Sequence, residues 1–374
     1  MFTEDDLNSA VDAGVLNGAA LERLKSHIAN ERRAVSADEE SLRLVHSFND
    51  IFVTLAILIA FFGLGALGSI VSVMVLGAFG ASLTSAVMAG AAWGLAEIFT
   101  RKRRMAFPSI VLFLTFFTSV FMTFASYSFV GAIAVGSGAF AGVLIAFAAF
   151  ASAIAAWLHW KRFHVPISIA AIASAVIAAV GSFLFSIMAA IDLAFAWAVL
   201  PALVFVLGLG VFAAALAFDA SDRERITQRS DIAFWLHLLA SPLIVHPVFQ
   251  SLGVLEGDVG GFGAVIVIAL YGVFAAIALI VDRRALLVSA LLYVAVALAF
   301  LFSALGSFSL TSALSALVIG SGLLTLSIFW AGLRRWIVAR MPLMVQAQVP
   351  AVAEAEEIYE EEDYSEYGGR YSAH

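Results

Sequence analysis

The sequence predicts an all-α membrane protein, a polytopic bundle of about ten transmembrane helices arranged as five hairpins. Its 374 residues are 63% hydrophobic and 13% charged, whereas soluble domains are about half apolar and about a quarter charged. Between residues 51 and 332, all 11 Lys and Arg residues fall into four short clusters. The clusters lie within residues 101–104, 161–162, 223–229 and 283–284. The apolar runs between the clusters are each long enough to cross a bilayer twice.

The segment that precedes the first apolar run, residues 1–47, predicts a cytoplasmic amphipathic helical hairpin and a linker. Thr3 is followed by three acidic residues, as is typical of a helix start. Leu7, Val11 and Val15 then recur at the spacing of one helical face. So short a hairpin buries little core, and we expect it to pack on another surface. No cleavable signal peptide is recognisable here, so the first apolar run is expected to direct membrane insertion.

A hydrocarbon core of ~30 Å is crossed by roughly 20 helical residues, and this length divides the predicted bundle, residues 48–340, into ten spans. They are 50–69, 77–99, 106–126, 131–158, 164–186, 193–217, 231–250, 261–281, 285–305 and 310–332. Every basic cluster follows an even-numbered span, and Arg334, Arg335 and Arg340 follow the tenth. Because Lys and Arg collect on the cytoplasmic side of inserted helices, we expect both termini to be cytoplasmic.

Three pairs of short landmarks recur along the chain at offsets of 181, 180 and 184 residues. The pairs begin at residues 49 and 230, 103 and 283, and 136 and 320. Such offsets favour a parallel duplication of spans 1–4 and 7–10 around spans 5–6, as in transporters with repeats of equal orientation. The alternative is that hairpins in a bilayer of fixed thickness place their connections at similar intervals.

The last segment, residues 341–374, predicts a disordered acidic cytoplasmic tail. Eight acidic residues lie between Glu354 and Glu366, and residues 1–344 hold 19 basic and 19 acidic side chains. The net charge of −7 therefore belongs to the tail, which buries too little apolar surface to fold alone. The tail is either a docking segment for a basic protein partner or a solvated terminus. Basic residues are too few for nucleic-acid binding.

Span 7 carries the polar groups that are the best candidates for a membrane site, because polar groups at membrane depth are costly. They are His237, Ser241 and His246. Pro242 and Pro247 in the same span have no N–H, which frees backbone carbonyls next to a titratable imidazole. Such a place suits a cation or a proton relay. The alternative is that these side chains only join helices through hydrogen bonds.

The outer side of the predicted bundle carries three acidic residues, Asp192, Glu256 and Asp258. With His246 they are candidate ligands of a weak outer-face cation site, since carboxylate and imidazole both bind divalent metals. No ligand spacing supports a metal site, however, and loop carboxylates are commonly just solvated. The chain has no Cys, which excludes disulfides and thiolate sites. No cofactor is expected.

Other polar and small residues predict structural roles. Asp50 and Asp231 lie at the starts of predicted spans, where carboxylates cap helices. Glu97 precedes Arg101 by one helical turn, a spacing that favours an ion pair. Pairs of glycines separated by one residue permit close helix approach in membranes. These pairs are 136 and 138, 208 and 210, and 320 and 322.

Short strings of this chain resemble a family of bacterial predicted multi-pass membrane proteins of unknown function with a short N-terminal helical segment. They are Ala13-Gly14-Val15-Leu16, Leu21-Glu22-Arg23-Leu24 and the segment 231–239, DIAFWLHLL. The resemblance implies a multi-pass protein of the bacterial cytoplasmic (inner) membrane and assigns no functional residue.

The sequence favours a small-solute or ion transporter or permeation path, through its span count, the repeat and span 7. The alternative is a non-catalytic scaffold or assembly factor that recruits partners through its termini. An intramembrane enzyme is the third hypothesis, with Ser241 and His237 as the one nucleophile–base neighbour pair. The expected surroundings are the lipid bilayer, and the oligomeric state is left open.

Overall fold

The computed structural model describes most of the chain from Phe48 onward. The described residues are 17–18, 20–21, 23, 48–72, 74, 80–135, 138–223, 225, 227–254, 261–302, 308–346 and 348–350. Every regular element in these ranges is a helix, and ten helices are long and apolar enough to cross a membrane. The prediction of an all-α polytopic bundle with about ten spans is therefore confirmed. The acidic stretch after Pro350 lies outside the described residues. The predicted N-terminal hairpin also lies outside them, except for five residues between 17 and 23.

Each predicted span coincides with one long helix. These are α3 (Phe48–Val71), α4 (Gly80–Ala96) with the π-helix η3 (Glu97–Lys102), α5 (Ala106–Val135), α6 (Gly138–Phe163), α7 (Ile167–Ile191), α8 (Leu193–Ser221), α9 (Gln228–Gln250), α10 (Gly261–Val281), α11 (Ala285–Phe302) and α12 (Phe308–Ile328). Helix ends differ from the prediction in several places: α5 continues to Val135, α6 begins only at Gly138, and charged residues continue some helices. Helix α6, for example, runs through Lys161 and Arg162, because long basic side chains reach the interface while their stems stay in apolar surroundings.

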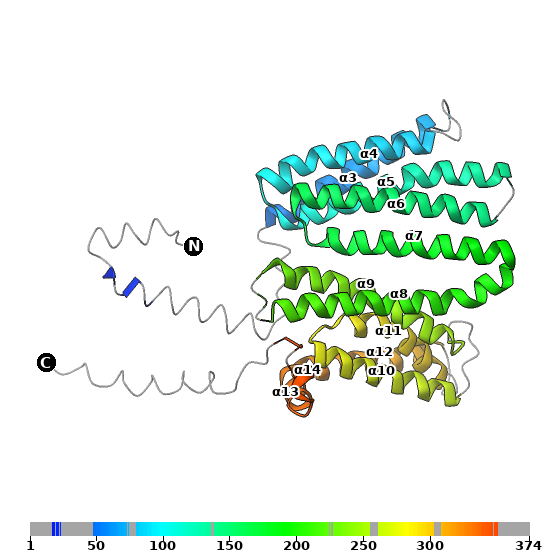
Figure 1. The fold of residues 1–374 in the computed structure, drawn as a ribbon. Helices are drawn as coiled ribbons and strands as arrows, with labels where there is room; N and C mark the ends of the chain where they lie inside the picture. Colours follow the sequence, from blue (N-terminus) through cyan, green and yellow to red (C-terminus); the bar gives the residue numbers. More distant parts are fainter. Residues whose placement is uncertain are drawn as a thin grey trace.

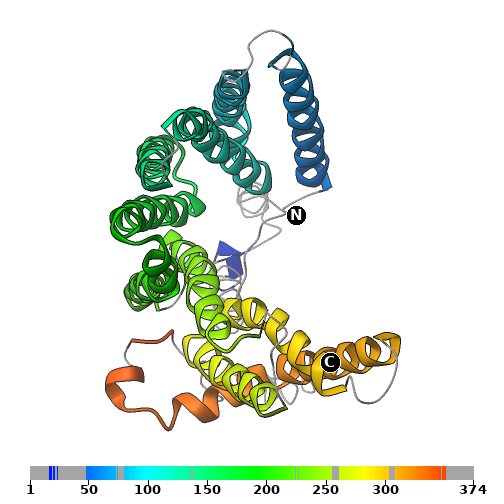
Figure 2. The same ribbon diagram turned by 90° about the vertical axis from the view of Figure 1, so that its right-hand side faces the viewer.

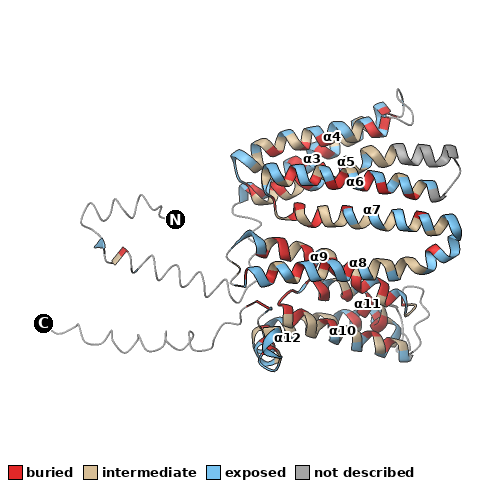
Figure 3. Cartoon of the chain, viewed as in Figure 1, coloured by how far each residue is buried: buried red, intermediate tan, exposed pale blue. Residues whose placement is uncertain are grey.

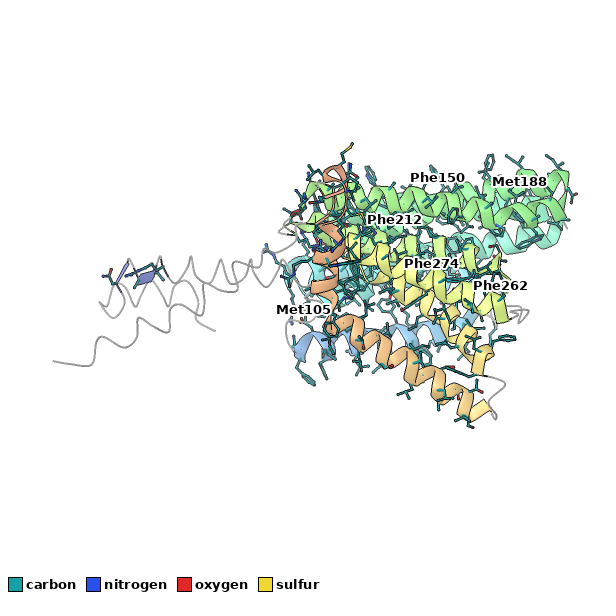
Figure 4. All side chains as sticks on the ribbon, turned by 90° about the horizontal axis from the view of Figure 1, so that it is seen from below. Met105, Phe150, Met188, Phe212, Phe262 and Phe274 are labelled. Atoms are coloured by element: carbon teal, nitrogen blue, oxygen red, sulfur yellow. The ribbon has the colours of Figure 1, made fainter. Side chains whose placement is uncertain are left out.

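The long helices run back and forth, and each packs mainly on its neighbours along the chain (Figure 1). Viewed along the helix axes they follow an open arc from α3 to α12 (Figure 2). Met188 and Phe262 lie at the end of the bundle opposite to Met105, in agreement with this alternation (Figure 4). The basic clusters therefore lie at one end of the molecule, called the basic end below.

Four connections at the basic end share one backbone feature. Each contains a non-glycine residue with positive φ: Arg104 (53°), His164 (53°), Arg225 (55°) and Asp282 (58°). A left-handed residue after a helix satisfies its last carbonyls and reverses the chain in few residues. These connections are therefore short, and they hold the charged residues beside the helix ends.

Helix α9 lies at the centre of the arc and is the most buried span. In its most apolar stretch 56% of the residues are buried, against 11–44% in the other nine. It packs on α7, α8 and α11, and buried residues gather on α9 and α11 (Figure 3). The polar span 7 of the sequence is thus the helix most shielded from lipid.

Glycine allows α8 and α9 to approach closely at one point. A Cβ atom on Gly208 would lie 2.8 Å from Leu243 Cβ and 3.0 Å from the Leu243 carbonyl carbon. The prediction of close approach holds for Gly208 and not for Gly210, Gly320 or Gly322, around which a Cβ atom would meet nothing within 4 Å. Backbone-to-backbone packing of this kind is a principal source of helix association in membranes.

The chain after α12 turns along the basic end. Two short helices follow, α13 (Trp330–Val338) and α14 (Leu343–Gln346). Val349 and Pro350 are buried against the bundle, although the acidic tail was expected to begin at residue 341. The chain is thus packed on the bundle as far as Pro350, the last described residue, because the backbone carbonyls of Gln346, Val349 and Pro350 accept hydrogen bonds from arginines of the bundle.

Candidate functional site

A buried acid and a buried histidine join α8 to α9 near the basic end. His237 Nε2 donates a hydrogen bond to Asp219 Oδ2 over 2.8 Å, and the side chains are 2% and 1% exposed. Asp219 is two residues from the end of α8, while His237 is nine residues into α9. The Phe212 ring stands edge-on to the imidazole, with centroids 5.2 Å apart. The pair therefore lies beside an aromatic ring within two of the helices that are long and apolar enough to cross a membrane, with Asp219 near the end of its helix.

Arg283 completes this cluster from the turn between α10 and α11. Its Nη2 donates to Asp219 Oδ1 over 2.6 Å and to the carbonyl of Ser230 over 3.1 Å, and the side chain is 3% exposed. The turn is only three residues long, and Asp282 adopts positive φ within it. This conformation accompanies an Arg283 side chain that points into the bundle. We call Asp219, His237 and Arg283 the buried triad.

A second cluster surrounds the neighbouring carboxylate of Asp282. Trp330 Nε1 on α13 donates to Asp282 Oδ1 over 2.7 Å, and Arg225 Nη1 lies 2.8 Å from Oδ2 as an ion pair. Arg334 Nε on α13 lies 3.6 Å from Oδ1. Adjacent residues 282 and 283 therefore serve two separate clusters, one toward α13 and one toward α8.

The connection between α8 and α9 is held by a third carboxylate. Asp222 Oδ2 accepts hydrogen bonds from the Thr227 N–H and hydroxyl and from the Ser230 N–H. The N-cap of α9 is Thr227, whose hydroxyl accepts from the Arg229 N–H over 3.2 Å. The prediction that Asp231 caps this helix was wrong, because the helix begins earlier and places Asp231 in its first turn.

Two arginines fasten the chain that follows α14. Arg223 donates to the carbonyls of Val349 and Gln346, each over 3.0 Å. Arg334, which also faces Asp282, donates to the Pro350 carbonyl over 2.7 Å. We call the described residues 343–346 and 348–350 the C-terminal strap. The strap joins the α8–α9 connection to α13 and ends where the acidic stretch of the sequence begins.

Removing one member of the buried triad is expected to be costly. Two charges leave water when Asp219 and Arg283 pair inside the protein, and their attraction offsets this penalty only while both remain. Deleting one partner leaves an uncompensated buried charge, at a cost of about 3–5 kcal/mol. The triad therefore holds α8, α9 and the α10–α11 turn together only while all its partners are present.

The structure separates the three residues predicted as a site in span 7. His237 belongs to the buried triad, and Ser241 Oγ donates to the carbonyl of His237 on its own helix. His246 Nδ1 instead pairs with the hydroxyl of Tyr293 on α11. Ser241 faces its own backbone while the His237 imidazole faces Asp219, so these two are not aligned as nucleophile and base.

The outer-face residues are only partly described. Asp192 is the N-cap of α8, where its Oδ1 accepts from the Ala194 and Phe195 N–H groups, while Glu256 and Asp258 lie outside the described residues. Over the described ranges, no three His, Asp or Glu side chains are grouped as metal ligands. The carboxylate of Asp192 thus has a structural role at this end.

The ion pair predicted for Glu97 is confirmed and is larger than expected. Glu97 lies 3.3 Å from Arg101 and also 2.8 Å from Arg162 on α6. About one turn before Arg162 on α6, the His159 imidazole is fully buried among aromatic rings, those of Trp93, Phe113, Phe116 and Phe163. Neither His159 nitrogen has a hydrogen-bond partner among the described residues. This first half of the arc is therefore held by aromatic packing and an exposed ion pair.

Asp219, Asp282 and Arg283 were not predicted as site residues. In the sequence, the basic cluster at 283–284 reads only as a marker of the cytoplasmic side. It gives no sign that Arg283 points inward while Arg284 is exposed. One signal was present: Asp282 and Arg283 stand between two apolar runs with almost no connecting residues. Charged residues without a loop to hold them in water have to lie against the helix ends.

Comparison of the chain with protein-family models, with curated proteins and with solved structures finds no match in any of the three.

Proposed function

We propose that this membrane protein is a small-solute or ion transporter, in which the buried triad couples proton exchange to the closure of the basic end. The observation that carries the proposal is the Asp219 carboxylate shared between His237 and Arg283 (2.8 and 2.6 Å). Ionisable groups inside membrane spans are rare, and they commonly mark ion pathways and proton relays.

The chemistry of the triad suits such coupling. With a neutral imidazole, Asp219 and Arg283 balance each other, and the cluster carries no net charge. A proton on His237 adds a positive charge in a site closed to water, and histidine is the side chain that exchanges protons near neutral pH. Separation of α8 from α9 would hydrate that charge. Protonation thus favours an arrangement in which this contact is open.

We place the basic end in the cytoplasm of a bacterial inner membrane, following the distribution of Lys and Arg. The triad then lies just inside the cytoplasmic ends of α8 and α9. In this arrangement it forms an inner closure between α8 and α9.

The test is proton flux into vesicles that contain the purified protein and a pH-sensitive dye. With a panel of solutes supplied outside, wild-type vesicles should show solute-dependent flux, which Asp219→Asn and His237→Gln should abolish. His246→Gln is the matched control, because His246 pairs with Tyr293 outside the triad, and it should retain flux. Wild-type vesicles that match empty ones for every solute would exclude transport.

The alternative of a scaffold is favoured by one observation, the C-terminal strap. Arg223 and Arg334 bind the carbonyls of Gln346, Val349 and Pro350, so the acidic stretch starts from a defined place on the basic end. A scaffold that recruits partners through its termini predicts a co-purifying complex that is lost on deletion of residues 1–47 or 351–374. Intact co-purification after both deletions would exclude this function.

A further inference from the structure

A groove lies between α8 and α9 at the end remote from the basic clusters. Its lining comes from one stretch of each helix and includes a proline from each, Pro201 and Pro247. The other lining residues are Trp197, Ala198, Ala202, Phe205, Val248, Gln250 and Ser251. Its volume of about 580 Å³ is in the range of small-molecule sites. Phe205 is twelve residues into α8, so the groove reaches from the outer face to about the middle of the bilayer.

The groove is apolar along its length and polar at its outer mouth. Pro201 has no N–H, so it cannot satisfy the carbonyl of Trp197 one turn earlier. Ser251 donates its hydroxyl proton to the carbonyl of Val248 over 2.7 Å, which leaves its oxygen as an acceptor, and Gln250 is exposed beside it. The mouth therefore offers carbonyl, hydroxyl and amide oxygens to a bound head group.

Charge at the groove selects against anions. Residues 163–222 and 230–282, which include α7, α8, α10 and all of α9 after Arg229, contain no Lys or Arg. An anionic head group would find no cation to pair with, whereas Asp192 lies five residues before Trp197 at the start of α8. The Trp197 indole, held edge-on by Phe185 with centroids 5.0 Å apart, is also the best aromatic partner for a cation.

We propose that the α8–α9 groove binds an amphiphilic ammonium ion, with its alkyl chain between Pro201 and Pro247 and its charged head at Trp197 and Gln250. A membrane span offers this groove directly to molecules dissolved in the bilayer. The inference names the substrate class of the proposed transporter, and its role in transport rests on that proposal. Binding itself does not depend on the buried triad at the other end of the same helices.

The test is photolabelling of the full-length protein in lipid nanodiscs with a dodecyltrimethylammonium probe that carries a diazirine on its alkyl chain. Adducts located by mass spectrometry should concentrate on residues 197–205 and 247–251. Ala202→Phe, which fills the groove, should lower their yield about tenfold or more. Ala213→Phe is the matched control, an exposed alanine on the same helix outside the groove, and should leave the yield unchanged.

The outcomes distinguish binding from transport. Excess unlabelled dodecyltrimethylammonium should abolish the adducts on wild-type protein, a result independent of whether Ala202→Phe folds, and the matched dodecyl sulfate probe should not label the groove. Equal labelling by both probes, adducts spread over the lipid-facing surfaces of α3 and α12, or failure of the competition would overturn the site. Labelling without flux in wild-type vesicles would therefore reject the transporter and keep the site.

Discussion

Substituting Gly208 by alanine tests the packing that brings α8 and α9 together. The new Cβ would lie 2.8 Å from Leu243 Cβ, 3.0 Å from its carbonyl carbon and 3.1 Å from its carbonyl oxygen. Two of these three atoms are backbone, which a rotamer change does not move away, so the helices themselves have to separate. Overpacking of this kind costs about 1–3 kcal/mol.

Gly210→Ala on the same helix is the control for helix propensity. A Cβ there would meet nothing within 4 Å, and alanine is favoured over glycine in a helix by up to about 1 kcal/mol. We expect Gly208→Ala to lower the free energy of unfolding, and Gly210→Ala to leave it unchanged or raise it. The measurement is unfolding by SDS in mixed micelles, followed by circular dichroism. Equal effects of the two substitutions would refute the close approach of α8 and α9.

Three further predictions concern charged residues. Asp219→Asn should destabilise the protein by about 3–5 kcal/mol in the same SDS titration, because it leaves Arg283 as an unpaired buried charge. The double variant Asp219→Leu with Arg283→Met should recover most of this loss, since no buried charge is left alone. A double variant no more stable than the single one would contradict this. Glu97→Gln should cost less than about 1 kcal/mol, because the Glu97 ion pairs are exposed; a loss as large as that of Asp219→Asn would contradict the exposure argument. Arg334→Ala should release the C-terminal strap and speed proteolytic cleavage after Arg340. The control is Arg335→Ala, on the exposed face of the same helix. Equal cleavage rates for the two variants would show that Arg334 does not hold the strap.

The helical spans were predictable because lipid imposes length and composition on every one of them. A helix that crosses the bilayer needs about 20 apolar residues, and the charged residues between the runs mark the connections. Helix ends were less predictable. Helix α6 continues through Lys161 and Arg162, since a long basic side chain reaches water from inside the helix, and a charged residue thus does not end a helix.

The buried triad could be predicted only in part. His237 was identified because a histidine within an apolar span is unusual, but its partners come from α8 and from the α10–α11 turn, 18 and 46 positions away in the sequence. Arg283 and Arg284 are adjacent and alike in sequence, yet one is 3% exposed and the other faces the Trp330 ring from the surface. Their difference accompanies a positive φ at Asp282, a local conformation that the residue types do not specify.

The proposed inner closure depends most directly on the side of the membrane at which the basic end lies. The chain contains no Cys, so single cysteines introduced at the exposed positions Lys102, Arg284 and Ser251 report their own accessibility to a membrane-impermeant maleimide. In intact cells, we expect labelling at position 251 and protection at 102 and 284, with all three labelled after permeabilisation. Labelling of positions 102 and 284 from opposite sides, or of both from outside, would contradict the account.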